Sequence, residues 1–378
     1  MNPSDPESSR DLRDLVLILG IPFDNVSMDQ LVAMIDGFVA SGQPHLLATA
    51  NVNFVAKALH DPEFLQVVQM ADVITADGMP ILWAGRLLGC PLQERVTGSD
   101  LVPRMAKEAA DKGYRILLLG GAPGVGDAAV AKLQAQYPGL DIYAYSPPFD
   151  PLLEMNSEQI IQRVREIDPD LLFVSFAAGK SEKWLAMNLQ DLDVPLCAGV
   201  GATIDFLAGR VSRAPVWMQR SGLEWIYRIY KEPRRMWRRY AGDLIVFSRA
   251  FVRTWVRDCF FRIFSRKNTE KRTEERMSSA GKRYTLSGRI NAKNKEEHAQ
   301  AVTGLLSQGT PVFLQMHGIS FIDSSGLGML VGLEKEARRL EVPLIVVNPS
   351  EQAMTTLRLA RLDRLLRIEG SMPEAEAA

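Results

Sequence analysis

The chain has 378 residues, with 44 Lys and Arg, 45 Asp and Glu, and a formal net charge of -1. Hydrophobic residues make up 47% and charged residues 24%, which excludes wholesale disorder and a collagen-like architecture and favours two or three globular domains. Cys90, Cys197 and Cys259 are far apart and form no CxxC pair, so they predict neither a disulfide framework nor a zinc knuckle and indicate a reducing cytoplasm. Residues 1–14 are polar, show no secretory signal pattern, and are expected to be disordered.

The charge is distributed unevenly along the chain. Residues 210–267 hold 15 Lys and Arg against 4 Asp and Glu, so the remainder of the chain is acidic. An asymmetry of this size predicts an anionic partner for the basic segment, namely phosphates, nucleic acid or an acidic membrane surface.

Residues 15–215 alternate short apolar runs with amphipathic stretches. This alternation predicts a Rossmann-like α/β domain with a mostly parallel, helix-covered sheet, whose ligands bind at the carboxyl ends of the strands. The expected strands are Leu15–Leu19, His45–Ala50, Val73–Thr75, Arg115–Leu119, Leu171–Ser175 and Pro195–Val200, and the expected helices include Leu31–Ala40, Leu101–Lys112 and Asp127–Gln136.

Polar residues follow two of these strands. Thr49 and Asn51 end the second expected strand, and Asp77 follows the third. A lone aspartate after a strand is most often a helix cap. Asp77 is a stronger candidate because Thr49, Asn51 and Arg95 are expected to converge on it from neighbouring strand ends.

Gly120, Gly121 and Gly124 follow the Arg115–Leu119 strand and precede a helix, where backbone N–H groups can hold a phosphate. An ordinary strand-to-helix turn explains them equally well. Their order lacks the Lys-Ser/Thr of a P-loop and differs from the dinucleotide fingerprint, which disfavours NAD binding. The D-x-D pairs at 168–170 and 191–193 precede strands, at the edge opposite the expected site, so we expect no metal site and no cofactor.

Residues 216–265 interleave aromatic residues with arginines. Arg249, Arg253 and Arg257 are four apart and are expected on one helix face, with Phe247 and other aromatics on another. Central arginines cost about 2.5–3.5 kcal/mol each on insertion scales, which argues against a membrane span and favours an interfacial helix.

The charged residues 266–282 predict a flexible linker that lets the following unit fold and dock independently. That unit, residues 283–370, is a second, small α/β domain with a frayed tail at 371–378. Its expected strands are Arg283–Ser287, Pro311–Met316 and Pro343–Val347, and its expected helices are Glu296–Leu306, Ser325–Leu340 and Glu351–Ala360.

Three runs carry a family resemblance: ADGMPILWAGRLLGCPLQERVTGSDL, LLLGGAPG, and GVGATIDFLAGRVSRAPVWMQRSGLEWIYRIYKEPRRMWRRY. In this order they resemble the TagA/WecG/CpsF glycosyltransferases, over about residues 15–240. These bacterial enzymes typically transfer N-acetylmannosamine from its UDP conjugate onto an undecaprenyl-diphosphate-linked amino sugar. The resemblance implies an inverting, metal-independent hexosyltransferase of cell-envelope polysaccharide synthesis.

The resemblance also implies roles for single residues. Asp77 corresponds to the general base, with Thr49 and Asn51 beside it and Arg95 in the pocket. Arginines suit a diphosphate because they are always charged and donate bidentate hydrogen bonds. For the arginines of residues 216–265, here called the appendage, attraction to an anionic membrane is an equally good explanation. The implied substrate-binding residues are Arg95, Gly120, Gly121, Glu182, Arg228, Arg235 and Arg238.

One motif departs from the family. Where the family has Pro-Lys-Gln-Glu, this chain has Gly179-Lys180-Ser181-Glu182. Lys180 and Glu182 persist, but the glutamine that is expected to touch substrate is replaced. The identity of the donor or acceptor therefore stays open.

The run FIDSSGLGMLVGL, from Phe321 to Leu333, resembles the signature of STAS domains, the fold of anti-sigma-factor antagonists. The resemblance implies phosphorylation at Ser324, and a kinase or anti-sigma-like partner. A helix cap made by Asp323, Ser324 and Ser325 explains the same residues, and a passive scaffold is the other outcome.

Two functions follow from these observations. The first is a glycosyltransferase, cytoplasmic and peripheral on the inner face of the cell membrane, with a regulatory or docking STAS domain. Its partners are a UDP-sugar, an undecaprenyl-diphosphate-linked acceptor and anionic lipid. The alternative is a non-catalytic regulator that senses a nucleotide sugar or lipid. Nucleic-acid binding is disfavoured because the basic segment carries bulky apolar residues at helical spacing.

Overall fold

The computed structural model describes residues 13–177, 179–215, 217–218, 223–231, 233–264, 275–278 and 281–370; some side chains after residue 224 also lie outside the described part. Its contacts divide the chain into two compact units. The central unit consists of Val26–Ala84 and Leu92–Ala250. The terminal unit consists of the residues up to Asn25, Gly85–Pro91, and the residues from Phe251 onward.

The central unit is built on a six-stranded sheet, which confirms the predicted α/β fold class. The strand order is β4-β3-β8-β7-β5-β6, and every neighbouring pair is parallel. The carboxyl ends of all six strands therefore share one edge, where such sheets bind ligands. The strands are β3 (His45–Ala50), β4 (Val73–Ala76), β5 (Ile116–Gly120), β6 (Ile142–Tyr145), β7 (Leu171–Ser175) and β8 (Leu196–Gly199).

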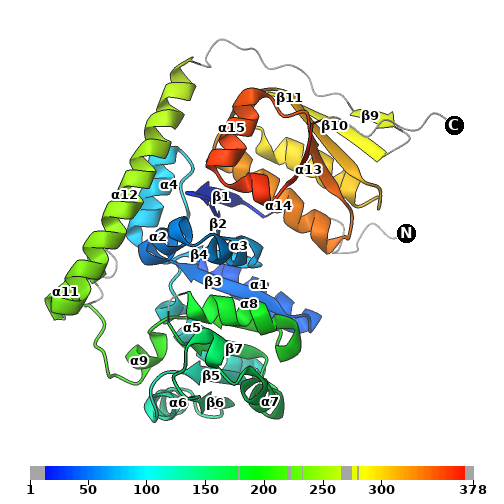
Figure 1. Cartoon of the computed structure of the whole chain (residues 1–378). Coiled ribbons are helices and arrows are strands. Elements are labelled where there is room, and N and C mark those ends of the chain that lie inside the picture. The colour runs from blue at the N-terminus through cyan, green and yellow to red at the C-terminus, as the bar shows by residue number, and fades with distance from the viewer. Residues whose placement is uncertain are drawn as a thin grey trace. The chain divides into compact units, whose positions relative to one another are not determined.

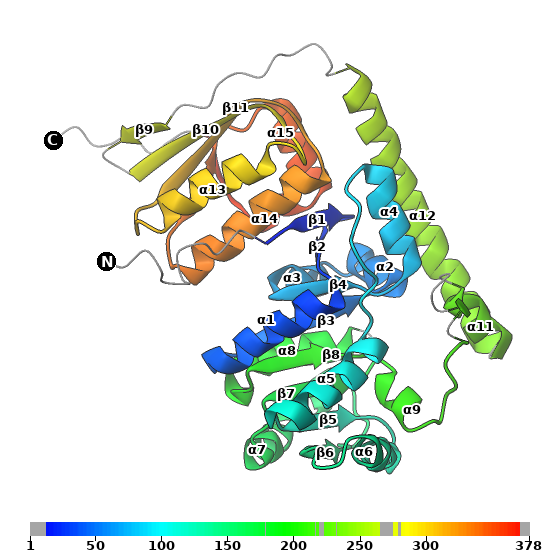
Figure 2. The ribbon, with the colours of Figure 1, turned by 180° about the vertical axis from the view of Figure 1, so that it is seen from behind.

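Helices cover both faces of this sheet. Residues of α1, α5, α6 and α9 share one apolar core with the strands, while α8 packs on β8 and β3 with α2, α3 and α7 around it. Figures 1 and 2 show the two layers from opposite sides. The helices are α1 (Met28–Ser41), α2 (Val52–His60), α3 (Pro62–Met70), α5 (Gly98–Lys112), α6 (Val125–Gln136), α7 (Ser157–Ile167), α8 (Lys180–Leu192) and α9 (Thr203–Leu207), with a 3-10 turn η1 (Leu152–Glu154) before α7.

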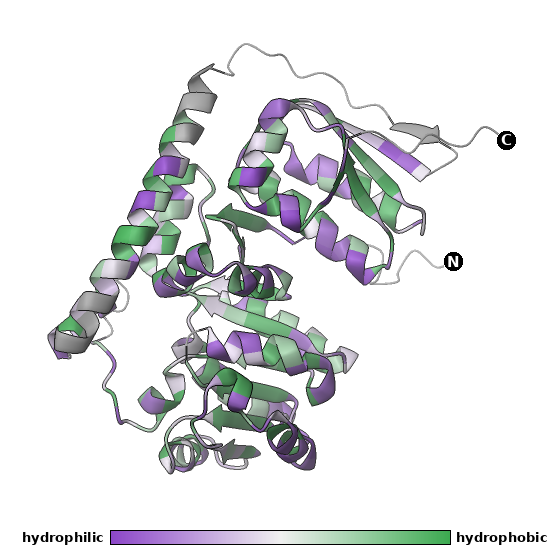
Figure 3. Ribbon diagram, in the orientation of Figure 1, coloured by the Kyte–Doolittle hydropathy of each residue, from purple (hydrophilic) through white to green (hydrophobic). Residues whose placement is uncertain are grey.

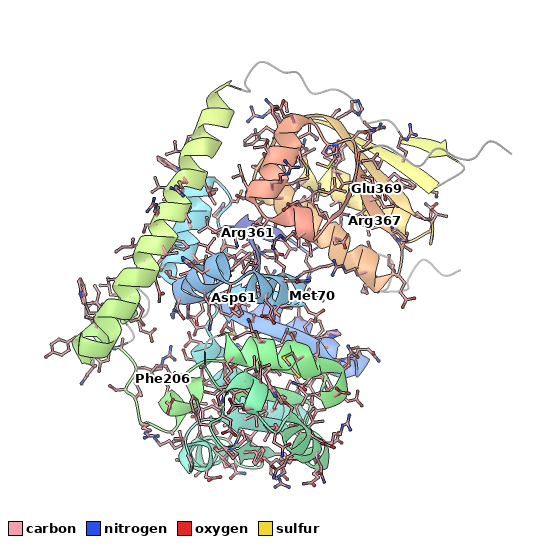
Figure 4. The ribbon with its side chains drawn as sticks, in the orientation of Figure 1. Asp61, Met70, Phe206, Arg361, Arg367 and Glu369 are labelled. Atoms are coloured by element: carbon pink, nitrogen blue, oxygen red, sulfur yellow. The ribbon has the colours of Figure 1, made fainter. Side chains whose placement is uncertain are left out.

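Local side chains fix where these helices begin. Ser27 and Gln30 form a reciprocal capping box at α1, and Thr97 caps α5. Asn51 caps α2, and Asp61, labelled in Figure 4, caps α3. Strands β5 and β7 are buried along their length. Figure 3 shows by colour that the strands of this sheet are mostly hydrophobic. A sheet buried on both faces is rigid enough to hold its loop residues in fixed positions.

The first expected strand lies elsewhere. Residues Leu15–Ile18 form β1, which pairs antiparallel with β2 (Ile21–Asp24) in a two-stranded hairpin and takes no part in the six-stranded sheet. The prediction of a parallel strand here was wrong because Leu19 and Gly20 both have positive φ, 52° and 87°. Two such residues make the tight turn that reverses a strand at once.

The terminal unit contains a five-stranded sheet of order β13-β12-β11-β10-β9. Its main core lies between this sheet and three helices, and it also includes Leu15 and Leu17 of β1. Two residues of this core therefore come from the start of the chain, outside the expected domain 283–370, whose independent folding stays a prediction. The elements are β9 (Glu275–Ser278), β10 (Gly281–Ile290), α13 (Lys295–Leu306), β11 (Val312–Ile322), α14 (Ser324–Arg339), β12 (Leu344–Val347), α15 (Glu351–Leu359), a 3-10 turn η3 (Leu362–Arg364) and β13 (Arg367–Glu369).

The expected linker at 266–282 is partly strand. Glu275–Ser278 forms β9 and pairs antiparallel with β10, which itself begins at Gly281. The remaining strands of this sheet, β10 to β13, pair in parallel. The backbone of β9 therefore hydrogen-bonds to the sheet, although residues 266–282 are mostly charged and polar. Composition alone predicts no strand there.

The described ranges also contain α4 (Met79–Leu88), α11 (Glu224–Lys231) and α12 (Pro233–Phe264). The long helix α12 confirms that the basic segment is helical, and its place at a membrane interface stays a prediction. Within the described ranges, none of the helices has the length and the apolar run that crossing a bilayer requires.

Candidate active site

The carboxyl edge of the six-stranded sheet brings the predicted polar residues together. Thr49 and Ala50 end β3 and pair with Thr75 and Ala76 at the end of β4. The Thr49 hydroxyl is buried and donates to the carbonyl oxygen of Gly199, the last residue of β8, at 3.4 Å. Asn51 follows and accepts a hydrogen bond from the N–H of Phe54 at 3.1 Å. Thr49 and Asn51, the predicted neighbours of Asp77, therefore lie where β3, β4 and β8 end.

Asp77 and Arg95 lie at the same edge. The N–H of Asp77 donates to the carbonyl oxygen of Ala50 at 3.0 Å, which fixes Asp77 beside the end of β3. The N–H of Val96 donates to the carbonyl oxygen of Ala76 at 3.1 Å, and the Thr75 hydroxyl donates to the carbonyl oxygen of Val96 at 3.0 Å. The segment that carries Arg95 thus runs along the end of β4, next to the residue that precedes Asp77.

Arg95 belongs to a charged network that sequence reasoning missed. Its guanidinium lies 3.3 Å from Asp100 at the start of α5 and 3.5 Å from Glu224, the first residue of α11. Asp100 also pairs with Arg213 at 2.8 Å and accepts a hydrogen bond from the Thr97 hydroxyl at 2.8 Å. The network links Arg95 and the start of α5 to Arg213, in the segment after β8, and to helix α11.

The pKa of Asp100 reflects these partners. Burial alone would raise it, but hydrogen bonds and charge from Arg213, Thr97 and Arg95 hold the pKa of Asp100 below its ordinary value of 3.8. A lowered folded-state pKa means that the stabilisation is present above the unfolded value and is lost as the pH falls through the folded one.

Asp100→Asn is therefore expected to lower the free energy of unfolding at neutral pH by about 1–3 kcal/mol, the cost of losing a charged hydrogen-bond partner. The deficit relative to the unmutated chain should shrink as the pH falls through the folded pKa of Asp100. Denaturant unfolding at several pH values measures both effects. A deficit of constant size at every pH would show that Asp100 is not ionised in the network.

The glycine loop lies at the end of β5. Gly120, Gly121 and Gly124 have φ values of 104°, 79° and 78°. A Cβ on Gly120 would lie 2.6 Å from the carbonyl oxygen of Ser175, so only glycine allows β5 and β7 to approach this closely. Gly124 leads into α6 without a side-chain cap. Close packing thus requires glycine at Gly120, and positive φ favours it at Gly121 and Gly124. Phosphate binding by Gly120 and Gly121 stays a prediction.

Glu182 lies in the first turn of α8 and is buried. Its carboxylate accepts the N–H of Gly179 at 2.7 Å, and a Cβ on Gly199 would overlap its Oε1. Burial raises the pKa of Glu182. The described contacts of this carboxylate are with the protein, and its predicted contact with substrate is untested.

The departure from the family motif has a local explanation. Gly179 has φ 83°, a conformation closed to proline, and a Cβ there would lie 2.5 Å from Nζ of Lys57. Ser181 is buried, and its hydroxyl accepts the N–H of Phe176 at 3.1 Å. The Ser181 side chain therefore hydrogen-bonds to the backbone of the loop that precedes α8. Lys57 fills the space beside Gly179.

An open pocket of about 470 Å³ lies next to this loop, between α2 and α12. The Asn53 side-chain amide donates to Asp243 of α12 at 2.7 Å across it. Its lining residues are Asn53, Ala56, Lys57, His60, Ala177, Asp243 and Val246. Asn53, which lines the pocket, follows Asn51 by two residues. The pocket therefore lies next to the sheet-edge site.

Arg228 lies in α11, and Arg235 and Arg238 lie in α12, but their side chains are outside the described part. The D-x-D carboxylates lie at the amino edge of the sheet, where Asp170 accepts the N–H of Arg115 at 2.7 Å. In the described ranges, His, Cys, Asp and Glu side chains do not gather in threes as a metal ion would require.

Ser324 is the first residue of α14 and is 5% exposed. Asp323 before it accepts the N–H groups of Ser325 and Gly326, both at 2.9 Å. The signature therefore forms a helix cap, as the simpler interpretation predicts, and the phosphorylation of Ser324 is untested.

Comparison with known proteins identifies the family. The model of the glycosyl transferase WecG/TagA/CpsF family matches residues 16–259, more than half of the chain. The chain belongs to this family. It also carries a STAS domain, whose model matches residues 272–375. The family match extends through α11 and most of α12, so the appendage is part of the transferase stretch.

Curated relatives agree with this assignment. The N-acetylglucosaminyldiphosphoundecaprenol N-acetyl-beta-D-mannosaminyltransferases of Staphylococcus aureus strains MRSA252 and MW2 are each 30% identical over 223 residues, which cover 58% of this chain and 86% of theirs. Among solved structures, SpoIIAA in its unphosphorylated form is 21% identical over 27% of this chain and 90% of its own, with a TM-score of 0.23. An anti-sigma factor antagonist from Mycobacterium paratuberculosis is 18% identical over 27% and 86%, with a TM-score of 0.25.

Proposed function

We propose that this glycosyltransferase moves N-acetylmannosamine from a UDP-sugar onto an undecaprenyl-diphosphate-linked amino sugar, with inversion at the anomeric carbon and without a metal ion. The observation that carries the proposal is the convergence of Thr49, Asn51, Asp77 and the Arg95 segment where β3, β4 and β8 end. The relatives' names supply the sugar and the acceptor class.

The chemistry follows from one base and one leaving group. The Asp77 carboxylate accepts the proton of the acceptor hydroxyl as that oxygen attacks the anomeric carbon. The bond from this carbon to the β-phosphate oxygen breaks, and UDP leaves with the electron pair. Attack opposite the leaving group inverts the configuration.

Arginines stabilise the charge that develops on the UDP group. Arg95 has two carboxylate neighbours, Asp100 and Glu224, so part of its charge is already balanced. We assign to Arg95 the additional task of holding α11 through Glu224. Since α11 also carries Arg228, this ion pair sets where the appendage begins relative to Asp77.

We place α12 on the inner face of the cell membrane. Leu244, Ile245, Val252 and Val256 are more than 40% exposed, and Ile245 and Val252 are seven residues apart, which puts them on one face. Arg249 and Arg253 are exposed beside them. Apolar side chains flanked by arginines are typical of a helix that lies in the lipid interface. This placement suits an acceptor held in the bilayer by its lipid.

Incubation of the full chain with UDP-N-acetylmannosamine and a lipid-diphosphate-linked N-acetylglucosamine tests the proposal. We expect UDP release that needs both substrates and continues in EDTA. Loss of release in EDTA with recovery on adding a divalent metal would contradict metal independence. Binding of both substrates without any UDP release would favour the alternative, a non-catalytic regulator.

We retain Ser324 as a proposed phosphorylation site that changes partner binding by the STAS domain. Phosphopeptide mass spectrometry of the chain from its native cytoplasm tests this, together with partner capture by Ser324→Ala and Ser324→Asp. An unmodified Ser324 and identical partner sets for the two variants would leave the STAS domain as a scaffold.

A further inference from the structure

The β1–β2 hairpin is packed against the STAS helix α14. All eight strand residues of the hairpin are buried. Leu15 and Leu17 belong to the same apolar core as Leu327, Leu330 and Val331 of α14. Figures 1 and 2 both show β1 beside α14. The hairpin therefore covers one side of this helix within the terminal unit.

The closest approach is at Gly328. A Cβ built on Gly328 would overlap the carbonyl oxygen of Leu15 and lie 2.6 Å from its carbonyl carbon. Gly326, by contrast, faces Ile290 and Ile322 of the STAS sheet. Since any side chain at 328 would push the strand away, this glycine fits α14 to the backbone of a strand.

Two polar contacts flank the apolar one. Lys295 of α13 pairs with Asp14, directly before β1. The Ser325 hydroxyl lies 3.0 Å from Sγ of Cys90, which belongs to the segment Gly85–Pro91. The first contact holds the residue before the hairpin against α13, and the second holds the segment Gly85–Pro91 against the start of α14.

The hairpin differs from the rest of the terminal unit in how it is held. In the described part of the chain it forms a sheet of its own and shares no strand pairing with either larger sheet. Residues 15–24 also fall outside the STAS match at 272–375. Apolar packing on α14 and the ion pair between Asp14 and Lys295 help to hold it there, and a two-stranded hairpin is only marginally stable by itself.

We propose that the hairpin Leu15–Asp24 is an internal, detachable ligand of the STAS domain, and that the α14 face centred on Gly328 is a strand-binding surface. A protein partner at this surface must present an apolar β-strand and displace the hairpin. Displacement frees the chain before α1. The inference does not depend on the proposed reaction, because its test reads structure and not turnover.

Hydrogen exchange of the full chain tests the proposal. In the unmutated protein we expect the amides of 15–24 to exchange faster than those of β11, as a locally opening element does. Gly328→Ala should speed exchange at 15–24 by about tenfold or more and leave β11 unchanged. Gly304→Ala is the matched control, because α13 has open space at Gly304.

Two outcomes would overturn the proposal. If 15–24 and β11 exchange together and Gly328→Ala exposes both, the hairpin is a fixed layer of the domain. If Gly328→Ala leaves 15–24 as protected as before, the hairpin does not dock at Gly328.

Leu17→Ala covers the case in which Gly328→Ala does not fold, because it removes hairpin apolar surface from the shared core and leaves α14 unchanged. It should speed exchange at 15–24 and leave β11 unchanged. Exchange at 15–24 that stays as slow as in the unmutated chain, or that rises together with that of β11, would contradict the proposal.

Discussion

Asp77→Asn is expected to reduce sugar transfer by about 10²- to 10⁴-fold while UDP binding stays near normal. The substitution keeps the size and the hydrogen-bonding reach of the side chain but removes the group that accepts the acceptor proton, so the loss falls on the chemical step. Transfer is measured as UDP release at saturating donor and acceptor, and UDP binding by calorimetry.

Asp111→Asn is the matched control, since Asp111 is exposed in α5. Its turnover should equal that of the unmutated chain. Near-normal turnover of Asp77→Asn would remove Asp77 from the role of base. Loss of UDP binding together with turnover would indicate that Asp77 holds the donor or the local fold instead.

Ile245→Asp/Val252→Asp is expected to weaken binding to phosphatidylglycerol vesicles by at least about 100-fold. Burying each such side chain contributes about 1.5–3 kcal/mol, and a carboxylate in its place adds repulsion from the anionic lipid. Ile245 and Val252 are 66% and 52% exposed, so the fold should tolerate the change. Vesicle sedimentation at several salt concentrations measures the loss.

Leu153→Asp provides the control for α12, because Leu153 is 88% exposed in η1, away from this helix. It should bind vesicles like the unmutated chain, with affinity that falls with salt but does not vanish. Equal vesicle binding by the α12 variant and this control would show that α12 is not the membrane contact.

The sequence predicted the sheet edge well because the signal there is local. Thr49 and Asp77 each follow a run of apolar residues that is too short for a helix, and parallel strands bring their ends to one edge. The capping role of Asn51 has the same local origin. Arg95 was also expected to converge on this edge, and the hydrogen bond between Val96 and Ala76 supplies the physical reason for its position.

The remaining site residues depend on contacts that no local pattern encodes. Arg213 and Glu224 follow Asp100 and Arg95 by more than a hundred residues, and their pairing depends on how the chain returns across the sheet. The basic excess of residues 210–267, which include both, was visible in the sequence. The partners of Arg213 and Glu224 were not. An isolated pair of opposite charges is too common on protein surfaces to be a signal.

The hairpin shows the limit of hydrophobic patterning. Leu15 and Leu17 were correctly expected in a strand, but the pattern does not say against which surface that strand packs. The turn at Leu19-Gly20 lacks the Asn-Gly or Asp-Gly signature of a tight hairpin, so a parallel strand was the natural prediction. Asp323, Ser324 and Ser325 of the STAS signature indicated a helix cap, and the signature gave no sign of a strand packed on Gly328.

Mass spectrometry of the acceptor lipid tests the central claim most directly. The full chain is incubated with UDP-N-acetylmannosamine and the lipid-diphosphate-linked N-acetylglucosamine, and the lipid is then extracted. We predict a lipid heavier by one N-acetylhexosamine with the full chain and with Asp111→Asn, and almost none with Asp77→Asn. An unchanged acceptor lipid, with the UDP-sugar either intact or merely hydrolysed, would contradict the assignment of this sheet-edge site as a sugar-transfer site.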